Sequence, residues 1–142
     1  MMKRSQAGFS LIEVLIAVVI VAIMGGLVAL NLDTDGARVT RTRAQMETLA
    51  QALRLYMAQQ GRLPTQEQGL EALVEKPTRP PVPPRFPDGG YLDSRRVPLD
   101  GWDRPFIYLV PGRSGEAFEI ISYGRDGMEG GTGHDADLST AD

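Results

Sequence analysis

The stretch GFSLIE at residues 8–13, with the apolar run that follows it, decides the organisation of this 142-residue chain. Nineteen residues, 14–32, carry no charged side chain. At about 1.5 Å per residue, a helix of that length matches the roughly 30 Å hydrocarbon core of a bilayer. Lys3 and Arg4 precede the run, and the next basic residue is Arg38. This charge bias predicts a membrane-spanning helix with a cytoplasmic N-terminus and an exported remainder.

Glu13 lies at the start of this apolar run. An ionised carboxylate inside a bilayer costs several kcal/mol unless it is paired, so its position predicts a functional role. A cleaved secretory signal peptide would share the charge bias. However, the carboxylate and the residues MGGL at 24–27 fit such a signal poorly. The apolar segment is therefore expected to remain in the mature protein.

The residues KRSQAGFSLIE, at positions 3–13, resemble the class III signal of type IV pilins and type II secretion pseudopilins. In those families a prepilin peptidase cleaves after the glycine and N-methylates the phenylalanine. The resemblance implies that residues 1–8 are a leader ending at Gly8 and that Phe9 becomes N-methylphenylalanine. It also implies that Glu13 neutralises the N-terminal amine of a neighbouring subunit during assembly. A plain single-span anchor with an incidental glutamate is the competing interpretation.

Composition limits the rest of the chain to one modest domain. Beyond residue 32 there are 110 residues, which is enough for a single core. The formal charge is −3, and −5 without Lys3 and Arg4 (13 basic against 18 acidic residues), so nucleic acid is not an expected partner. The chain has no cysteine. An exported domain must then be held by its core or by a metal, not by disulfides.

A helical pattern resumes after the polar interval at residues 31–36. The helix face expected to be buried carries Val39, Met46, Leu49, Leu53 and Tyr56, and the opposite face is mostly charged or polar. We expect one long helix over residues 9–60, with residues 9–32 in the membrane or in a filament core. Gly25 and Gly26 could loosen this helix, and Gly61 is expected to end it.

Residues 61–142 are expected to form the exported domain. Thr65 and Gln68 have capping-box spacing, which predicts a short helix over about residues 66–75. Six prolines within residues 77–87 predict an extended surface connection. Residues 106–110 and 117–123 predict an antiparallel hairpin, to which residues 91–92 could add a strand. The expected fold class is α+β, with a long helix packed on a small antiparallel sheet.

Three further segments are similar to the major pseudopilin of type II secretion. They are RLPTQEQGLEAL at residues 62–73, PLDGWDRPF at 98–106, and the C-terminal loop at 122–138. The resemblance implies a pilin-like fold with a periplasmic domain over residues 61–142. Two positions depart from the family pattern: Leu30 stands where many members have a proline, and Gly101 precedes Trp102 in place of a proline.

The C-terminal loop is a candidate metal site. Four acidic residues lie within residues 126–137, and carboxylate and carbonyl oxygens are the ligands that Ca²⁺ takes. The residues alone favour a solvated acidic tail. The resemblance instead implies a calcium site in which Asp126 and Asp135 are the main ligands, Asp137 is the next, and Tyr123 contributes its carbonyl.

An enzymatic function is not expected. His134 is the only histidine, and the sequence contains no nucleophile motif and no phosphate-binding loop. The predicted function is that of a structural subunit, a major pseudopilin. It would be made as a single-pass inner-membrane precursor and would polymerise into a helical periplasmic pseudopilus that helps to export folded proteins across the outer membrane.

The resemblance also implies the partners. They are other copies of the chain, minor pseudopilins, the inner-membrane assembly platform, the prepilin peptidase, and the membrane before assembly. One alternative is a type IV pilin of an extracellular pilus, serving adhesion, motility or DNA uptake. Such pilins often carry a C-terminal disulfide loop, and this chain has no cysteine. The other alternative is a monomeric membrane-anchored binding module.

Overall fold

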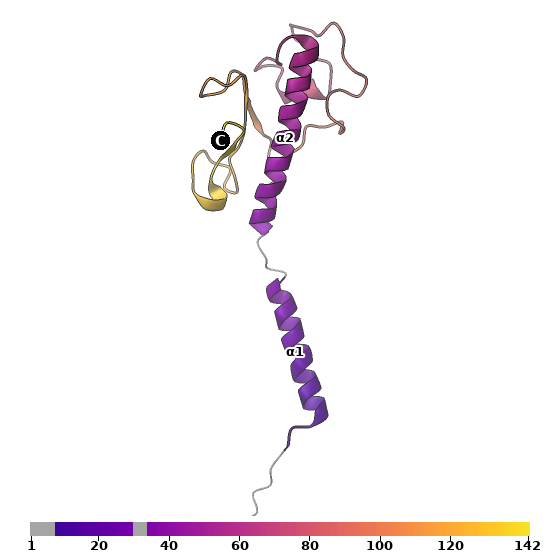
Figure 1. The fold of residues 1–142 in the computed structure, drawn as a ribbon, viewed down its shortest axis with the longest axis vertical. Helices are drawn as coiled ribbons and strands as arrows, with labels where there is room; N and C mark the ends of the chain where they lie inside the picture. The colour runs from indigo at the N-terminus through magenta and orange to yellow at the C-terminus, as the bar shows by residue number, and fades with distance from the viewer. Residues whose placement is uncertain (1–7, 30–33) are drawn as a thin grey trace, which may run out of the picture. The chain divides into compact units, whose positions relative to one another are not determined.

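The computed structural model describes residues 8–29 and 34–142, which belong to two compact units that meet at residues 34 and 35. In the first unit, helix α1 spans Leu11–Ala29. In the second, helix α2 spans Thr34–Gln60 and is followed by the remaining elements (Figure 1). The single helix predicted over residues 9–60 therefore corresponds to two described helices, α1 and α2. Residues 30–33, with the departure at Leu30, and most of the predicted leader lie outside the described ranges.

Helix α1 is apolar on all sides. It continues through Gly25 and Gly26, so these glycines do not end it. Its large apolar side chains from Leu11 to Met24 are all half exposed or more, with Val21 at 70% and Leu11 at 89%. None of the helices in the described ranges combines the length and the hydropathy that crossing a membrane requires. The last three residues of the predicted span, 30–32, are not among those described.

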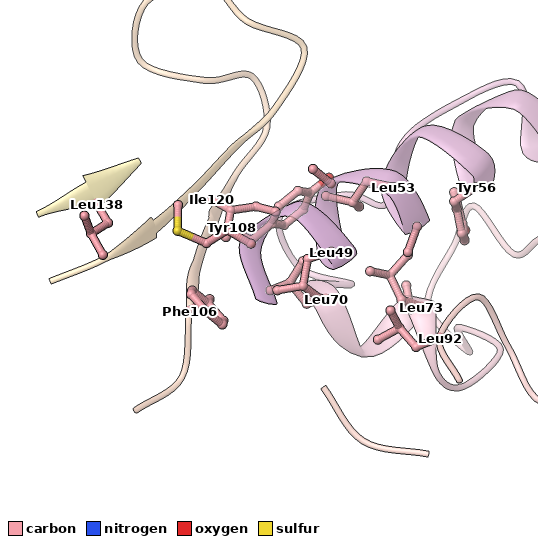
Figure 2. Packing of buried hydrophobic residues seen from close by; sticks show 14 residues of the cluster. Leu49, Leu53, Tyr56, Leu70, Leu73, Leu92, Phe106, Tyr108, Ile120 and Leu138 are labelled. Atoms are coloured by element: carbon pink, nitrogen blue, oxygen red, sulfur yellow. The ribbon is translucent and has the colours of Figure 1, made fainter. Parts of the chain in front are cut away.

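Helix α2 carries the main face of the hydrophobic core. Met46, Leu49, Leu53 and Tyr56 are buried, as predicted, and Val39 is partly buried against the same core. This face packs with side chains from the rest of the second unit, namely Leu70, Leu73, Leu92, Phe106, Tyr108, Ile120 and Leu138 (Figure 2). The core that holds residues 35–142 together is therefore built entirely within that unit.

Within the described residues the strands form one antiparallel sheet in the order β1-β2-β3. Strand β1 spans Ile107–Leu109, β2 spans Glu119–Ser122, and β3 spans Leu138–Ser139. Tyr108 is opposite Ile120, and Ser122 is opposite Leu138. The predicted hairpin is confirmed, with shorter strands than expected.

The expectation of a strand at residues 91–92 is wrong. The third strand comes from the C-terminal segment, whereas residues 91–92 have irregular backbone. The Tyr91 N–H donates to the carbonyl of Leu73 at 2.6 Å, and Leu92 is buried in the core. These residues are apolar because they pack in and against the hydrophobic core, not because they pair with the sheet.

The expectation of a helix over residues 66–75 is also wrong in extent. The predicted capping box is present: the Thr65 N–H donates to Gln68 Oε1 (3.0 Å), and the Gln68 N–H donates to Thr65 Oγ1 (3.1 Å). It closes only one turn, because Gly69 has a φ of +63°, in the left-handed region that an α-helix cannot contain. A 3₁₀ helix, η1, follows over Leu70–Leu73.

A buried carboxylate joins the tryptophan segment to the sheet. Asp100 is 1% exposed. Its Oδ1 accepts hydrogen bonds from the backbone N–H groups of Trp102 and Arg104, both at 2.9 Å, and its Oδ2 accepts one from the Ser122 hydroxyl at 2.6 Å. Both oxygens are therefore satisfied, which is the condition for burying a carboxylate in a stable domain.

Gly101 lies against α2, and this contact explains why glycine precedes Trp102. The Gly101 N–H donates to Thr42 Oγ1 at 2.8 Å, and the Thr42 hydroxyl donates to the Arg38 carbonyl at 2.8 Å. A Cβ at position 101 would collide with that carbonyl. A proline there would also lack the N–H that Thr42 accepts. Glycine is thus required by both the space and the hydrogen bond.

We predict that Thr42→Val destabilises the domain. Valine has nearly the same shape but leaves the buried Gly101 N–H without an acceptor, which should cost about 1–3 kcal/mol in the free energy of unfolding. Urea unfolding followed by the fluorescence of Trp102 measures the change. Thr42→Ser keeps the hydroxyl and should stay close to the wild type. Equal stability of the valine and serine variants would contradict the proposed role of this hydrogen bond.

Candidate functional site

The start of α1 brings Ser10 and Glu13 together in a reciprocal capping arrangement. The Ser10 N–H donates to Glu13 Oε2 at 3.0 Å, and the Glu13 N–H donates to Ser10 Oγ at 3.4 Å. An acidic side chain in the first helical turn also interacts favourably with the helix dipole. Glu13 therefore has a role within its own chain that the sequence analysis missed. Its signal was present in the spacing Ser-x-x-Glu.

Gly8 and Phe9 lie just before this helix start. Phe9 is 87% exposed, and α1 begins two residues later at Leu11. The Gly8–Phe9 bond therefore lies outside the helix.

The segment after α2 uses two glutamine side chains to hold distant backbone. The Gln66 amide nitrogen donates to the Tyr108 carbonyl, and its oxygen accepts from the Val110 N–H at 3.1 Å. The Gln68 amide nitrogen donates to the carbonyls of Arg79 (2.7 Å) and Pro81 (3.0 Å). This segment therefore fixes both the outer side of β1 and the proline-rich connection.

The predicted metal ligands lie in the C-terminal loop, where each has contacts of its own. Asp126 Oδ1 accepts from the Met128 N–H at 3.0 Å. Asp137 Oδ2 accepts from the Gly130 N–H at 3.0 Å, whereas its Oδ1 is buried without a hydrogen-bond partner. Tyr123 directly follows β2 and is half-buried. The loop thus contains one buried carboxylate oxygen for which the protein supplies no donor.

Asp135, the fourth predicted ligand, is paired with an arginine. Arg125 Nε lies 2.8 Å from Asp135 Oδ1, and Arg125 Nη2 lies 3.1 Å from Oδ2. The same guanidinium also reaches Asp35 Oδ2, at 3.2 Å, in the first turn of α2. The hydrogen bonds from Arg125 lower the pKa of Asp135 and, reciprocally, raise the pKa of Arg125. The role of Arg125 could not be predicted from the sequence, because an arginine in an acidic loop is usually a solvated charge.

A second arginine supports the loop backbone. Arg104 Nη1 donates to the carbonyls of Gly124 and Arg125, both at 2.8 Å. Gly127 packs on this guanidinium so closely that a Cβ there would lie 2.7 Å from its central carbon. Gly124 and Gly131 likewise leave no room for a Cβ against the backbone of residues 134–136. The glycines of this loop therefore permit a tight fold around Arg104.

The C-terminal loop offers donors of the kind that calcium needs. Oxygen ligands are available, and the unpartnered Asp137 Oδ1 is an atom that a cation would satisfy. Within residues 8–29 and 34–142, no three acidic or histidine side chains are grouped closely enough to hold a metal ion in the observed conformation. The chemistry fits a calcium ion. In the observed arrangement, however, both oxygens of Asp135 are bonded to Arg125.

Glu119 forms a separate buried ion pair that fixes the turn between β1 and β2. Its side chain is 2% exposed. It accepts from Arg113 Nη2 (2.6 Å), from the Arg113 backbone N–H (3.0 Å) and from the Ser139 hydroxyl (2.6 Å). Mainly because of the hydrogen bonds from Arg113, the pKa of Glu119 is lowered from 4.5 to about 2. This pair joins the turn, β2 and β3.

Comparison with known proteins gives a consistent result over the whole chain. Residues 30–141 match the family model "Type II secretion system (T2SS), protein G", and residues 3–29 match the prokaryotic N-terminal methylation motif. The chain is 41% identical to the type II secretion system core protein G of Pseudomonas aeruginosa, over 100% of this chain and 99% of that protein. It is 42% identical to the Aeromonas hydrophila protein of the same name, with 95% and 93% covered.

A solved structure is similar as well. The crystal structure of the major pseudopilin from the type 2 secretion system of enterohaemorrhagic Escherichia coli matches with a TM-score of 0.63 and 34% sequence identity. The match covers 76% of this chain and 90% of that structure. The pilin-like α+β fold predicted from the sequence is thereby confirmed.

We predict that the domain loses stability in acid through Glu119. Because the pKa of Glu119 is lower in the folded state, its contribution is complete above about pH 4.5 and is lost as the pH falls toward 2. The loss should be about 1–3 kcal/mol, because solvent screens the half-exposed Arg113 partner. Chemical unfolding at several pH values measures it. Glu119→Gln should be less stable at pH 7 and should have a flatter pH profile in this window, whereas Glu47→Gln, at an exposed position, should keep the wild-type slope.

Proposed function

The chain belongs to the protein G family of the type II secretion system, the major pseudopilins, and we propose that it polymerises into a periplasmic pseudopilus that helps to export folded proteins. The observation that carries the proposal is α1. Its apolar side chains are exposed on every side of the helix, and a surface of this kind needs lipid or other apolar helices around it. A membrane supplies that cover before assembly, and neighbouring subunits supply it in a helical filament.

The first step is membrane insertion and processing. The precursor would be a single-pass protein of the bacterial inner membrane, with residues 61–142 in the periplasm. The methylation motif over residues 3–29 supports cleavage of the leader after Gly8 by a prepilin peptidase and methylation of Phe9. The position of both residues ahead of α1 leaves this bond accessible. Further partners would be minor pseudopilins and the inner-membrane assembly platform.

Assembly is proposed to use Glu13. In the filament core its carboxylate would pair with the N-terminal amine that cleavage creates on Phe9 of a neighbouring subunit. The capping arrangement with Ser10 places the carboxylate beside the first turn of α1. Glu13 therefore has two separable functions, helix capping within its chain and charge pairing between chains.

Two substitutions separate these functions, and we predict opposite outcomes. Glu13→Gln keeps a capping side chain but has no charge, so it should abolish filament formation, since an unpaired buried amine costs about 3–5 kcal/mol. Ser10→Ala removes the cap but keeps the charge, so it should leave filaments intact. Electron microscopy of sheared filaments and a secretion assay measure both.

The intact mass of each variant serves as the control. It should show cleavage after Gly8 and one added methyl group, so that a variant that does not assemble is known to have been processed. Normal filaments from Glu13→Gln would contradict charge pairing. Loss of filaments from both variants would indicate that assembly needs the Ser10 cap as well as the charge of Glu13.

Calcium binding in the C-terminal loop is proposed as the feature that completes the folded domain. Asp126 and Asp137 would be carboxylate ligands, together with Asp135 and the Tyr123 carbonyl. The proposal is supported by the buried Asp137 Oδ1, which has no hydrogen-bond partner among the residues that the structure describes. A bound calcium ion would give Asp137 Oδ1 the partner that the described residues do not supply.

We predict that the full-length chain in detergent micelles melts several degrees higher in calcium than in chelator. Binding to the folded state adds about 2.7 kcal/mol when calcium is at a hundredfold excess over its Kd. Asp137→Asn should remove most of this difference, and magnesium should replace calcium poorly. Asp103→Asn changes an exposed carboxylate outside the loop and should keep the full difference. An unchanged melting temperature in calcium would identify the loop as a metal-free acidic segment.

A further inference from the structure

We propose that Arg125 is a built-in cation that closes the C-terminal loop in the absence of metal, and that calcium must displace it from Asp135 in order to bind. This inference rests on the calcium site proposed above. It concerns Arg125, which the chain itself places at that site. In this view the acidic side chains of the loop can bind either the guanidinium or a calcium ion.

The first argument is the geometry of the pair. Arg125 Nε and Nη2 each bond a different oxygen of Asp135, at 2.8 and 3.1 Å. This two-point contact uses the face of the carboxylate that a cation would approach, because Ca²⁺ binds carboxylate oxygens at about 2.3–2.6 Å. A divalent ion at Asp135 and a guanidinium in the same place would repel each other. A calcium ion that took both oxygens from this side would therefore have to displace the guanidinium.

The second argument is that Arg125 closes the loop through more than one contact. Its backbone N–H donates to the His134 carbonyl at 3.0 Å, so the two ends of the loop are joined at main chain as well as side chain. Arg104 holds the same end of the loop through the carbonyls of Gly124 and Arg125. Two guanidinium groups thus hold this end of the loop through contacts with its backbone and with Asp135.

The third argument concerns where Arg125 goes when it is displaced. Its Nη1 already lies 3.2 Å from Asp35, and the Asp35 side chain is 23% exposed. Asp35 is in the first turn of α2. When Asp135 is taken by calcium, the guanidinium keeps this second carboxylate as a partner. Metal binding would then leave Arg125 paired with the start of the helix alone.

The pairing predicts that replacing Arg125 has opposite effects on calcium affinity and on stability without calcium. Arg125→Gln removes the competitor, so its affinity for calcium should rise about tenfold over the wild type. The same variant loses the metal-free closure, so its melting temperature in chelator should fall by several degrees. A residue that simply stabilises the fold would lower the melting temperature without tightening calcium binding.

The experiment uses calorimetric titration of the full-length chain in detergent micelles with calcium chloride, together with thermal unfolding in chelator. Arg125→Lys keeps the positive charge but cannot make the two-point contact, so its calcium affinity should lie between those of the wild type and Arg125→Gln. Arg54→Gln removes an exposed arginine that pairs with Glu47 elsewhere on α2. It should leave the calcium affinity unchanged.

The outcomes distinguish this inference from the function on which it rests. If the wild type binds calcium and Arg125→Gln binds it no more tightly, the competition is refuted while the calcium site stands. If Arg125→Lys matches the wild type, a general charge effect replaces the specific pair. If neither the wild type nor Arg125→Gln binds calcium, both the metal site and the competition are refuted, and the role of the protein as a filament subunit is unaffected.

Discussion

Buried carboxylates with complete sets of donors are the interactions on which the exported domain depends. The strands within the described residues contain only three, four and two residues, and the chain has no disulfide to fix the long irregular segments. Asp100 and Glu119 take over this task. Each is at most 2% exposed, and each is bonded by groups from segments far apart in the chain. Burial strengthens these bonds, and it also makes any missing donor expensive.

The sequence predicted the features that follow a period or a motif. The buried face of α2 follows the helical repeat, and the hairpin follows β-branched and aromatic runs on either side of a turn. The capping box at Thr65 and Gln68 is also present, but the helix expected after it is not. Gly69 adopts a positive φ there, which interrupts the helix. The apolar residues after Gly69 had instead predicted that the helix would continue.

The features that the sequence did not reveal depend on contacts between distant residues. Strand β3 has two residues and no pattern of its own; it exists because Leu138 fills the core beside Ser122. The local sequence around Arg104 and Arg125 is that of ordinary surface charges. It does not indicate that Arg104 donates to main-chain carbonyls or that Arg125 pairs with a carboxylate. The acidic residues of the loop were identified, but not the basic side chains that share it.

The Gln66 amide has a further consequence for the edge of the sheet. Strand β1 lies at an end of the sheet, and an unpaired strand at such a position readily recruits another chain. Gln66 occupies the Tyr108 carbonyl and the Val110 N–H, groups to which an added strand would bond. The Gln66 side chain thus hinders the addition of a further strand at the β1 edge of the sheet. Copies of the chain at high local concentration are thereby hindered from pairing edge to edge through β1.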